Sequence, residues 1–289
     1  MLSLCAALVT GICRKYYANI GSNGAADGFI FNAVGGIVSA AVLLCPGGVG
    51  TCSTFTVLLG LAFGAVTAIQ SITNFSALQC GPMSYTSVII SFSTVISALS
   101  GVVFFGESIG WAQIIGIVLM LVSFVLAAKG GDGKRANLKW LILCLIAFAA
   151  TGGIGIMQKV HQSSAYSDEL SGFLIIAFIS SAVICALFSF FMIKRDKKSE
   201  DATPSKKPLW LVVAVMVACG VSVAVNNKFN LYLSGVMPSA VFFPIVNGGG
   251  LVLSTLAALI IFKERLTRRQ WVGVIVGIAS VVFLCDPFG

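Results

Sequence analysis

Long hydrophobic runs, separated by short breaks rich in glycine, proline and charge, fill most of this chain. A helix needs roughly 20 apolar residues to cross the hydrocarbon core of a bilayer. The runs are continuous rather than alternating, so they do not have the pattern of a membrane β-barrel. The fold class we predict is an all-α integral membrane protein with ten transmembrane helices, at residues 2–19, 27–45, 54–78, 83–105, 110–128, 138–160, 169–193, 209–234, 238–262 and 269–285.

Composition agrees with this prediction. Of the 289 residues, 58% are hydrophobic and 10% are charged, whereas a soluble domain carries about 25% charged residues. An ordinary soluble enzyme and a nucleic-acid-binding protein are therefore excluded, despite the net charge of +8. In the first span, Arg14 and Lys15 follow the apolar stretch and no basic residue precedes it, so we read it as a membrane helix and not as a signal peptide. We expect a multi-pass protein of a bacterial cytoplasmic (plasma) membrane.

The two halves of the chain resemble each other in sequence. Near the end of each half, a set of positions recurs at an offset of 157 residues, and weaker matches at offsets of 156 and 144 precede it in the same order. The chain therefore divides into a first repeat at 1–128, a linker at 129–138 and a second repeat at 139–289. Each repeat holds five predicted spans, an odd number, so the second repeat enters the membrane inverted relative to the first. Inverted repeats are typical of secondary transporters. The residues matching at 157 are Phe105, Glu107, Gln113, Gly116, Ser123 and Val125 with Phe262, Glu264, Gln270, Gly273, Ser280 and Val282.

On these residues, together with the Asn74/Pro82 and Asn230/Pro238 pairs, the sequence resembles the ten-helix EamA type of the drug/metabolite transporter superfamily. The resemblance covers essentially the whole chain. It implies two intertwined five-helix halves around a central cavity, lined mainly by the third, fourth, eighth and ninth helices. It does not indicate a substrate, because members of the superfamily move many kinds of metabolites and drugs.

Basic residues concentrate in the odd-numbered connections between the predicted spans. Of the 18 Lys and Arg residues, only Lys159 and Lys228 lie elsewhere. The positive-inside rule then places the odd connections in the cytoplasm and both termini outside. The resemblance implies the opposite orientation, because both termini are commonly cytoplasmic in the family.

Amide side chains and one lysine are the candidate substrate ligands of the third and eighth spans. Asn226 and Asn230 share a helix face, and the repeat relates them to Gln70 and Asn74. We expect the two pairs to face each other and to bind a polar solute, since amides both donate and accept. A structural role between helices is the alternative. Lys228 either faces the cavity or reaches back to the membrane interface.

The fourth and ninth spans supply the remaining candidates. Ser87 and Ser91 belong to a hydroxyl stripe with Ser84 and Thr94, and Tyr85 lies beside it. The stripe either forms a polar cavity wall or allows close helix packing. Asn247 precedes three glycines, which predicts a locally irregular helix lining the cavity.

Other ionisable residues lie in loops or at span ends. We expect Glu107 to stabilise a turn, and we expect Lys159 and His161 to be interfacial, with a gate charge as the alternative for Lys159. No carboxylate is predicted at mid-membrane, and no motif for catalysis, metal or cofactor binding is found, so no enzyme is predicted.

The predicted function is alternating-access transport of a small polar metabolite, either amino-acid-like or another zwitterionic or anionic solute. A multidrug or organic-cation exporter is the alternative. The expected partners are the small-molecule substrate and the lipid bilayer, and a homodimer is left open.

Overall fold

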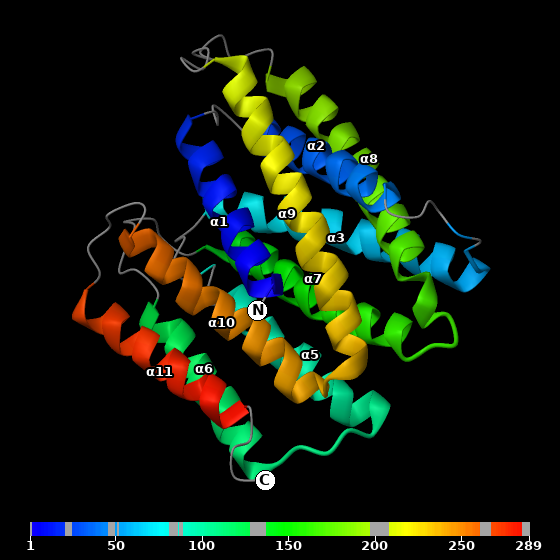
Figure 1. Cartoon of the computed structure of the whole chain (residues 1–289). Coiled ribbons are helices and arrows are strands. Elements are labelled where there is room, and N and C mark those ends of the chain that lie inside the picture. Colours follow the sequence, from blue (N-terminus) through cyan, green and yellow to red (C-terminus); the bar gives the residue numbers. More distant parts are fainter. Residues whose placement is uncertain are drawn as a thin grey trace. The chain divides into compact units, whose positions relative to one another are not determined.

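The computed structural model describes residues 2–20, 25–45, 50, 52–80, 86, 89–127, 137–196, 208–260 and 267–284. The described residues form helices and their connections, and contain no strand (Figure 1). The all-α prediction is therefore confirmed for this part of the chain. The helices are α1 (Leu2–Ile20), α2 (Ala25–Leu44), α3 (Thr54–Cys80), α5 (Ser93–Phe105), α6 (Trp111–Ala127), α7 (Leu138–Gln162), η1 (Ser167–Glu169), α8 (Leu170–Asp196), α9 (Leu209–Val236), α10 (Ser239–Ile260) and α11 (Arg268–Leu284).

Each of the ten predicted spans overlaps one of these α-helices along most of the helix. Five of the helices are long and apolar enough to cross a membrane: α2, α3, α7, α8 and α9. Shorter apolar helical stretches lie at Leu2–Arg14, Ile89–Phe105 and Trp111–Leu126. The count of ten transmembrane helices, and their arrangement as two inverted repeats, stays a prediction.

The chain forms two compact units, and each unit takes segments from both predicted repeats. Unit 1 comprises Met1–Phe75 and Ser164–Asn230, and unit 2 comprises Ser76–Ser163 and Leu231–Gly289. The predicted division at 1–128, 129–138 and 139–289 describes repeats in the sequence, and it stays a prediction beside this spatial division. α9 belongs to both units, because the boundary falls between Asn230 and Leu231.

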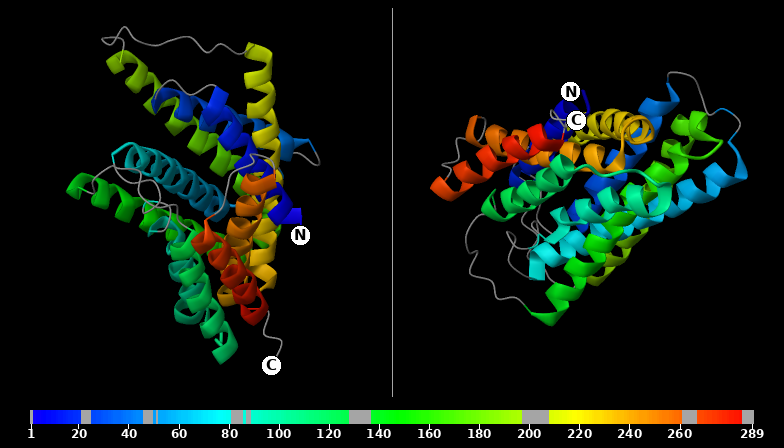
Figure 2. Two further views of the ribbon diagram at one scale, coloured as in Figure 1. Left: turned by 90° about the vertical axis from the view of Figure 1, so that its left-hand side faces the viewer. Right: turned by 90° about the horizontal axis from the view of Figure 1, so that it is seen from below.

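In unit 1, α2 and α8 lie side by side and antiparallel (Figures 1 and 2). Gly36 of α2 faces Ala182 and the Phe178 carbonyl of α8, while Phe29 at the start of α2 meets Phe188 further along α8. α3 joins this pair, since a Cβ at Gly64 would lie 2.4 Å from the carbonyl oxygen of Ala177. Small residues thus let these helices approach closely, as is typical of helix packing in membranes.

In unit 2, α6 and α11 form the corresponding antiparallel pair (Figure 2). Ser123 Oγ donates to the carbonyl oxygen of Gly273 at 2.7 Å. Toward the other end of the pair, a Cβ at Gly116 would lie 2.7 Å from Leu284 Cγ. These contacts use two positions that the sequence repeat relates to each other, Gly116 and Gly273.

Two hydroxyls of the predicted fourth span, those of Thr86 and Ser97, make helix-packing contacts in unit 2. Thr86 Oγ1 accepts a hydrogen bond from Trp140 Nε1 at 2.8 Å. Ser97 Oγ donates to the carbonyl oxygen of Gly152 at 3.2 Å, and a Cβ at Gly155 would lie 2.2 Å from Ser97 Oγ. Close packing of α5 on α7 is therefore one role of this hydroxyl-rich segment.

Candidate functional site

A small polar cluster joins α1 to α9 inside unit 1. Ser3 Oγ donates to Asn226 Oδ1 at 3.1 Å and also contacts Asn230 Oδ1. Ser3 is buried, with 3% of its surface exposed, and the two asparagines are half-buried. We call these three residues the amide cluster. Asn226 and Asn230 both reach Ser3 because they lie on one face of α9, as predicted.

The sequence positions the cluster through the packing of α1 on α9. Tyr17, at the far end of α1, packs with Met216 and Cys219 near the start of α9. The two helices are therefore antiparallel, and Ser3 at the start of α1 meets the later part of α9. Ser3 was not predicted, because a single small hydroxyl in an apolar run gives no pattern that distinguishes a ligand from a packing residue.

The amide cluster keeps hydrogen-bonding capacity for a ligand. Each asparagine carries two N–H donors and a carbonyl acceptor, while a serine hydroxyl offers a single proton to the two amide oxygens beside it. At membrane depth, unused donors and acceptors find few other partners than the protein or a bound solute. The arrangement therefore suits a solute with both donor and acceptor groups.

Lys228 does not share the face of the amide cluster. It lies two residues from both asparagines, which on an α-helix is about 200° around the axis from Asn226. The neighbouring Asn227 donates to the carbonyl oxygen of Val223 within α9 at 2.9 Å. Lys228 is half-buried, and its role as a substrate ligand stays a prediction.

Gln70 and Asn74 are half-buried on α3, also in unit 1. Their spacing of four residues puts them on one face of that helix. Their predicted position opposite Asn226 and Asn230 stays a prediction.

In unit 2, Asn247 contacts Thr94, one residue of the predicted hydroxyl stripe. Asn247 Nδ2 donates to Thr94 Oγ1 at 2.8 Å, which links α10 to α5. The predicted local irregularity at Gly248–Gly250 is wrong, since α10 continues as an α-helix through Pro244 and all three glycines. Ser91 is half-buried ahead of α5. Tyr85 and Ser87 lie outside the described residues.

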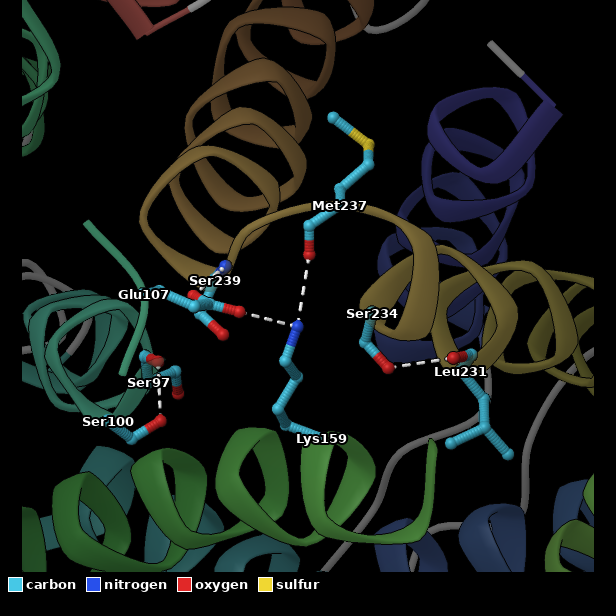
Figure 3. A network of polar contacts seen from close by, with 8 residues as sticks. All are labelled: Ser97, Ser100, Glu107, Lys159, Leu231, Ser234, Met237 and Ser239. Carbon is cyan, nitrogen blue, oxygen red and sulfur yellow. Dashed lines mark hydrogen bonds and ion pairs between the residues drawn. The ribbon is translucent and has the colours of Figure 1, made fainter. Parts of the chain in front are cut away.

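A charged cluster in unit 2 was not predicted (Figure 3). Lys159 Nζ on α7 lies 2.6 Å from Glu107 Oε1, and the side chains are 8% and 15% exposed. Lys159 Nζ also donates to the carbonyl oxygen of Met237 at 3.2 Å. The second Glu107 oxygen, Oε2, accepts from the backbone N–H of Ser239 at 2.6 Å. We call Glu107, Lys159 and the Met237–Ser239 turn the charge latch.

Two glycines shape the segment that carries Glu107. Gly106 ends α5 in the left-handed conformation with φ 64°, and the Glu107 N–H donates to the carbonyl oxygen of Gly101 at 3.1 Å. This conformation favours glycine, because other residues meet steric strain there. A Cβ at Gly101 would lie 2.0 Å from Glu107 Oε2 and 2.6 Å from Ser239 Cβ, so only glycine leaves room for the carboxylate.

The structure extends the prediction for Glu107 and corrects those for Lys159 and His161. Glu107 stabilises more than its own turn, because it accepts from the first residue of α10, where a negative charge is favourable to the helix dipole. Lys159 is a buried ion-pair partner and not an ordinary interfacial lysine. His161 is fully buried, with 0% of its surface exposed, and its Nδ1 lies 3.2 Å from Gln162 Nε2. All three residues lie near helix ends, where sequence alone does not separate an interfacial charge from a buried one.

Among the described residues, no group of three His, Cys, Asp or Glu side chains could hold a metal ion. The amide cluster and the charge latch are two of the polar clusters in this part of the chain. One is a set of neutral amides and hydroxyls, and the other is a paired acid and base.

Comparisons with known proteins give a family match for part of the chain and a fold match for nearly all of it. Residues 1–128 match the model of the EamA-like transporter family. An uncharacterized protein of Haemophilus influenzae is 24% identical over 234 residues, covering 78% of this chain and 73% of that protein. A solved crystal structure of a protein with 15% sequence identity matches at a TM-score of 0.74, covering 99% of this chain and 97% of the other. At that identity the structural likeness shows the fold alone.

Proposed function

We propose that this chain is a membrane transporter that moves a small polar metabolite by alternating access, because residues 1–128 match the model of the EamA-like transporter family, within the drug/metabolite transporter superfamily. The substrate class is an amino-acid-like or other zwitterionic or anionic solute. Ten transmembrane helices, arranged as two inverted repeats in a bacterial plasma membrane, form the transporter.

The amide cluster is the observation that carries this proposal. Ser3, Asn226 and Asn230 place one hydroxyl and two amides together on α1 and α9. Neutral groups of this kind bind both ends of a zwitterion without requiring a net charge in the site. A lipophilic cation would favour a carboxylate or an aromatic cage instead.

The pairing of Glu107 with Lys159 supports a substrate with little net charge. Within unit 2, this acid and this base lie 2.6 Å apart and neutralise each other. Neither is then a free counter-charge for a substrate or a coupling ion in the described state. We accordingly expect transport without proton coupling through Glu107.

Packing of repeat-related helices supports the inverted-repeat proposal. The second and seventh predicted spans, α2 and α8, pack together in unit 1. The fifth and tenth spans, α6 and α11, pack together in unit 2, as do the fourth and ninth, α5 and α10. Contacts between corresponding elements are what a pseudo-two-fold relation between two repeats produces.

A binding screen on the purified protein tests the proposal. Thermal stabilisation is measured against a panel of amino acids, other polar metabolites and lipophilic cations, and hits are then followed by flux into liposomes with and without a proton gradient. Stabilisation by one or a few polar solutes, with flux that is independent of the gradient, is the expected result. Broad stabilisation by lipophilic cations would replace the proposal by a multidrug exporter.

A further inference from the structure

Both charges of the latch hold one turn of the chain, the connection from α9 to α10. Lys159 donates to the carbonyl oxygen of Met237, before Pro238, and Glu107 accepts from the N–H of Ser239, after it. The turn is thus bonded on both sides of a proline. Figure 3 shows Lys159 reaching from α7 toward both Glu107 and Met237.

The same turn ends the helix that carries the amide cluster. Asn230 lies six residues before Val236, the last residue of α9, a rise of about 9 Å along the axis. α9 therefore has its candidate ligands in unit 1 and its end bonded by the latch in unit 2. Release of the latch would free the end of the helix on which the ligands sit.

The energetics of a buried ion pair suit a contact that opens and closes. Lys159 lies three residues before the end of α7, where a lysine can ordinarily reach water at the membrane face. In the latch it is withdrawn from water. The desolvation cost of such a pair roughly cancels its Coulomb attraction, so the dry, paired state and a hydrated, separated state lie close in free energy. An apolar contact has no comparable open state, because exposing it to water is unfavourable in proportion to its area.

We propose that Glu107 and Lys159 form a gate that holds the α9–α10 turn in one state of the transport cycle and releases it in another. The inference rests on the proposed function, since it gives the latch a role in alternating access. Two states separated by a small free-energy difference are what such a cycle requires.

Ser239 offers a reporter position for the opening. Its hydroxyl is buried and, among the described residues, has no hydrogen-bond partner. Ser239→Cys therefore removes no hydrogen bond and places a thiol beside Glu107. Ser280→Cys is the matched control, because Ser280 Oγ on α11 is likewise buried without a partner in the described part of the chain.

The experiment measures the rate at which a membrane-impermeant maleimide labels each reporter thiol in proteoliposomes, from both sides, with the nine native cysteines replaced. Three backgrounds are compared: the intact latch, Lys159→Met, and the apolar double variant Glu107→Leu/Lys159→Met. Lys159→Met leaves a buried carboxylate unpaired, so the thiol of Ser239→Cys should label at least about tenfold faster. The double variant should keep its thermal stability, and the same thiol should label at least about tenfold more slowly than with the intact latch. The control thiol of Ser280→Cys should label at one rate in all three backgrounds.

Uptake of a radiolabelled L-amino-acid mixture by the same proteoliposomes supplies the functional readout. The double variant, stable but closed, should lose uptake. Equal labelling of the Ser239→Cys thiol with the intact latch and in the double variant would overturn the gate, since the pair would then be a static structural contact. Retained uptake in a stable double variant would overturn it as well. If the protein with the intact latch takes up no amino acid, the proposed substrate class fails, while the labelling rates still decide on the gate.

Discussion

The amide cluster of unit 1 and the charge latch of unit 2 both join helices that are distant in the sequence, but they use different chemistry. In the amide cluster, one serine hydroxyl meets the oxygens of two amides, and among the described residues the amide N–H groups keep donor capacity. In the latch, each charged group bonds the other and also a backbone atom of the same turn. We infer a division of roles, with the neutral groups as solute ligands and the charged groups bonding the turn between α9 and α10.

The largest effect is expected from breaking the latch on one side. Lys159→Met removes the ammonium and leaves Glu107 buried without its partner, which costs about 3–5 kcal/mol of stability. Unfolding in detergent, followed by heat or by sodium dodecyl sulfate, measures the loss. The double variant Glu107→Leu/Lys159→Met should regain most of the lost stability, because it leaves no unpaired buried charge. A double variant as unstable as the single one would show that the loss does not come from the unpaired carboxylate.

The next effect should come from crowding the carboxylate. Gly101→Ala places a methyl group against Glu107 Oε2 and Ser239 Cβ, and overpacking of this kind costs about 1–3 kcal/mol. Gly153→Ala on α7 is the control, because a Cβ there meets no atom within 4 Å. The same unfolding assay should show a loss for Gly101→Ala alone, and equal stability of the two variants would mean that the latch has room to shift.

In unit 1, removal of one amide should affect binding more than stability. Asn230→Ala deletes a polar group that we assign to the solute, and the loss of one hydrogen bond weakens binding by about 1 kcal/mol, or roughly fivefold. Thermal-shift titration with a solute from the screen gives the change in affinity. Asn227→Ala should leave affinity unchanged, because Asn227 bonds the Val223 carbonyl of its own helix; an equal loss in both variants would move the site off this face of α9.

The smallest loss of stability should come from removing one interhelical serine hydroxyl, and it should be the same in the two units. Ser39 Oγ in unit 1 donates to the carbonyl oxygens of Gly220 and Gly35, and Ser123 Oγ in unit 2 donates to that of Gly273. Side-chain hydrogen bonds between membrane helices average about 0.6 kcal/mol. Ser39→Ala and Ser123→Ala should each lower stability by about that amount and leave solute affinity unchanged. A larger loss in either unit would mark its serine as more than a packing contact.

Helix positions followed from the sequence because hydrophobic length alone identifies membrane helices. Each predicted span overlaps a helix, and the resemblance to the drug/metabolite transporter superfamily is confirmed over residues 1–128. The amide pair Asn226/Asn230 was also predictable, since two asparagines four residues apart in an apolar run must share a face.

Tertiary partners were less predictable. Ser3 joins the amide cluster only because α1 runs antiparallel to α9. No local sequence pattern predicts that arrangement. Glu107 and Lys159 are far apart in the sequence and lie at helix ends, where a charge is ordinarily hydrated. Gly101 and Gly106 were the sequence features that could have indicated a closely packed Glu107, because glycines beside an acid allow another backbone to approach it. They do not show which segment approaches, since that depends on the tertiary fold.

Uptake by proteoliposomes tests directly whether the amide cluster binds the transported substrate. Flux of a radiolabelled L-amino-acid mixture is compared between the unaltered protein, Asn226→Leu/Asn230→Leu and Asn227→Ala, at matched reconstitution and thermal stability. We expect uptake by the unaltered protein and by Asn227→Ala, and uptake near that of empty liposomes for the double leucine variant. Unchanged uptake in the double leucine variant would contradict the assignment of the amide cluster to the substrate.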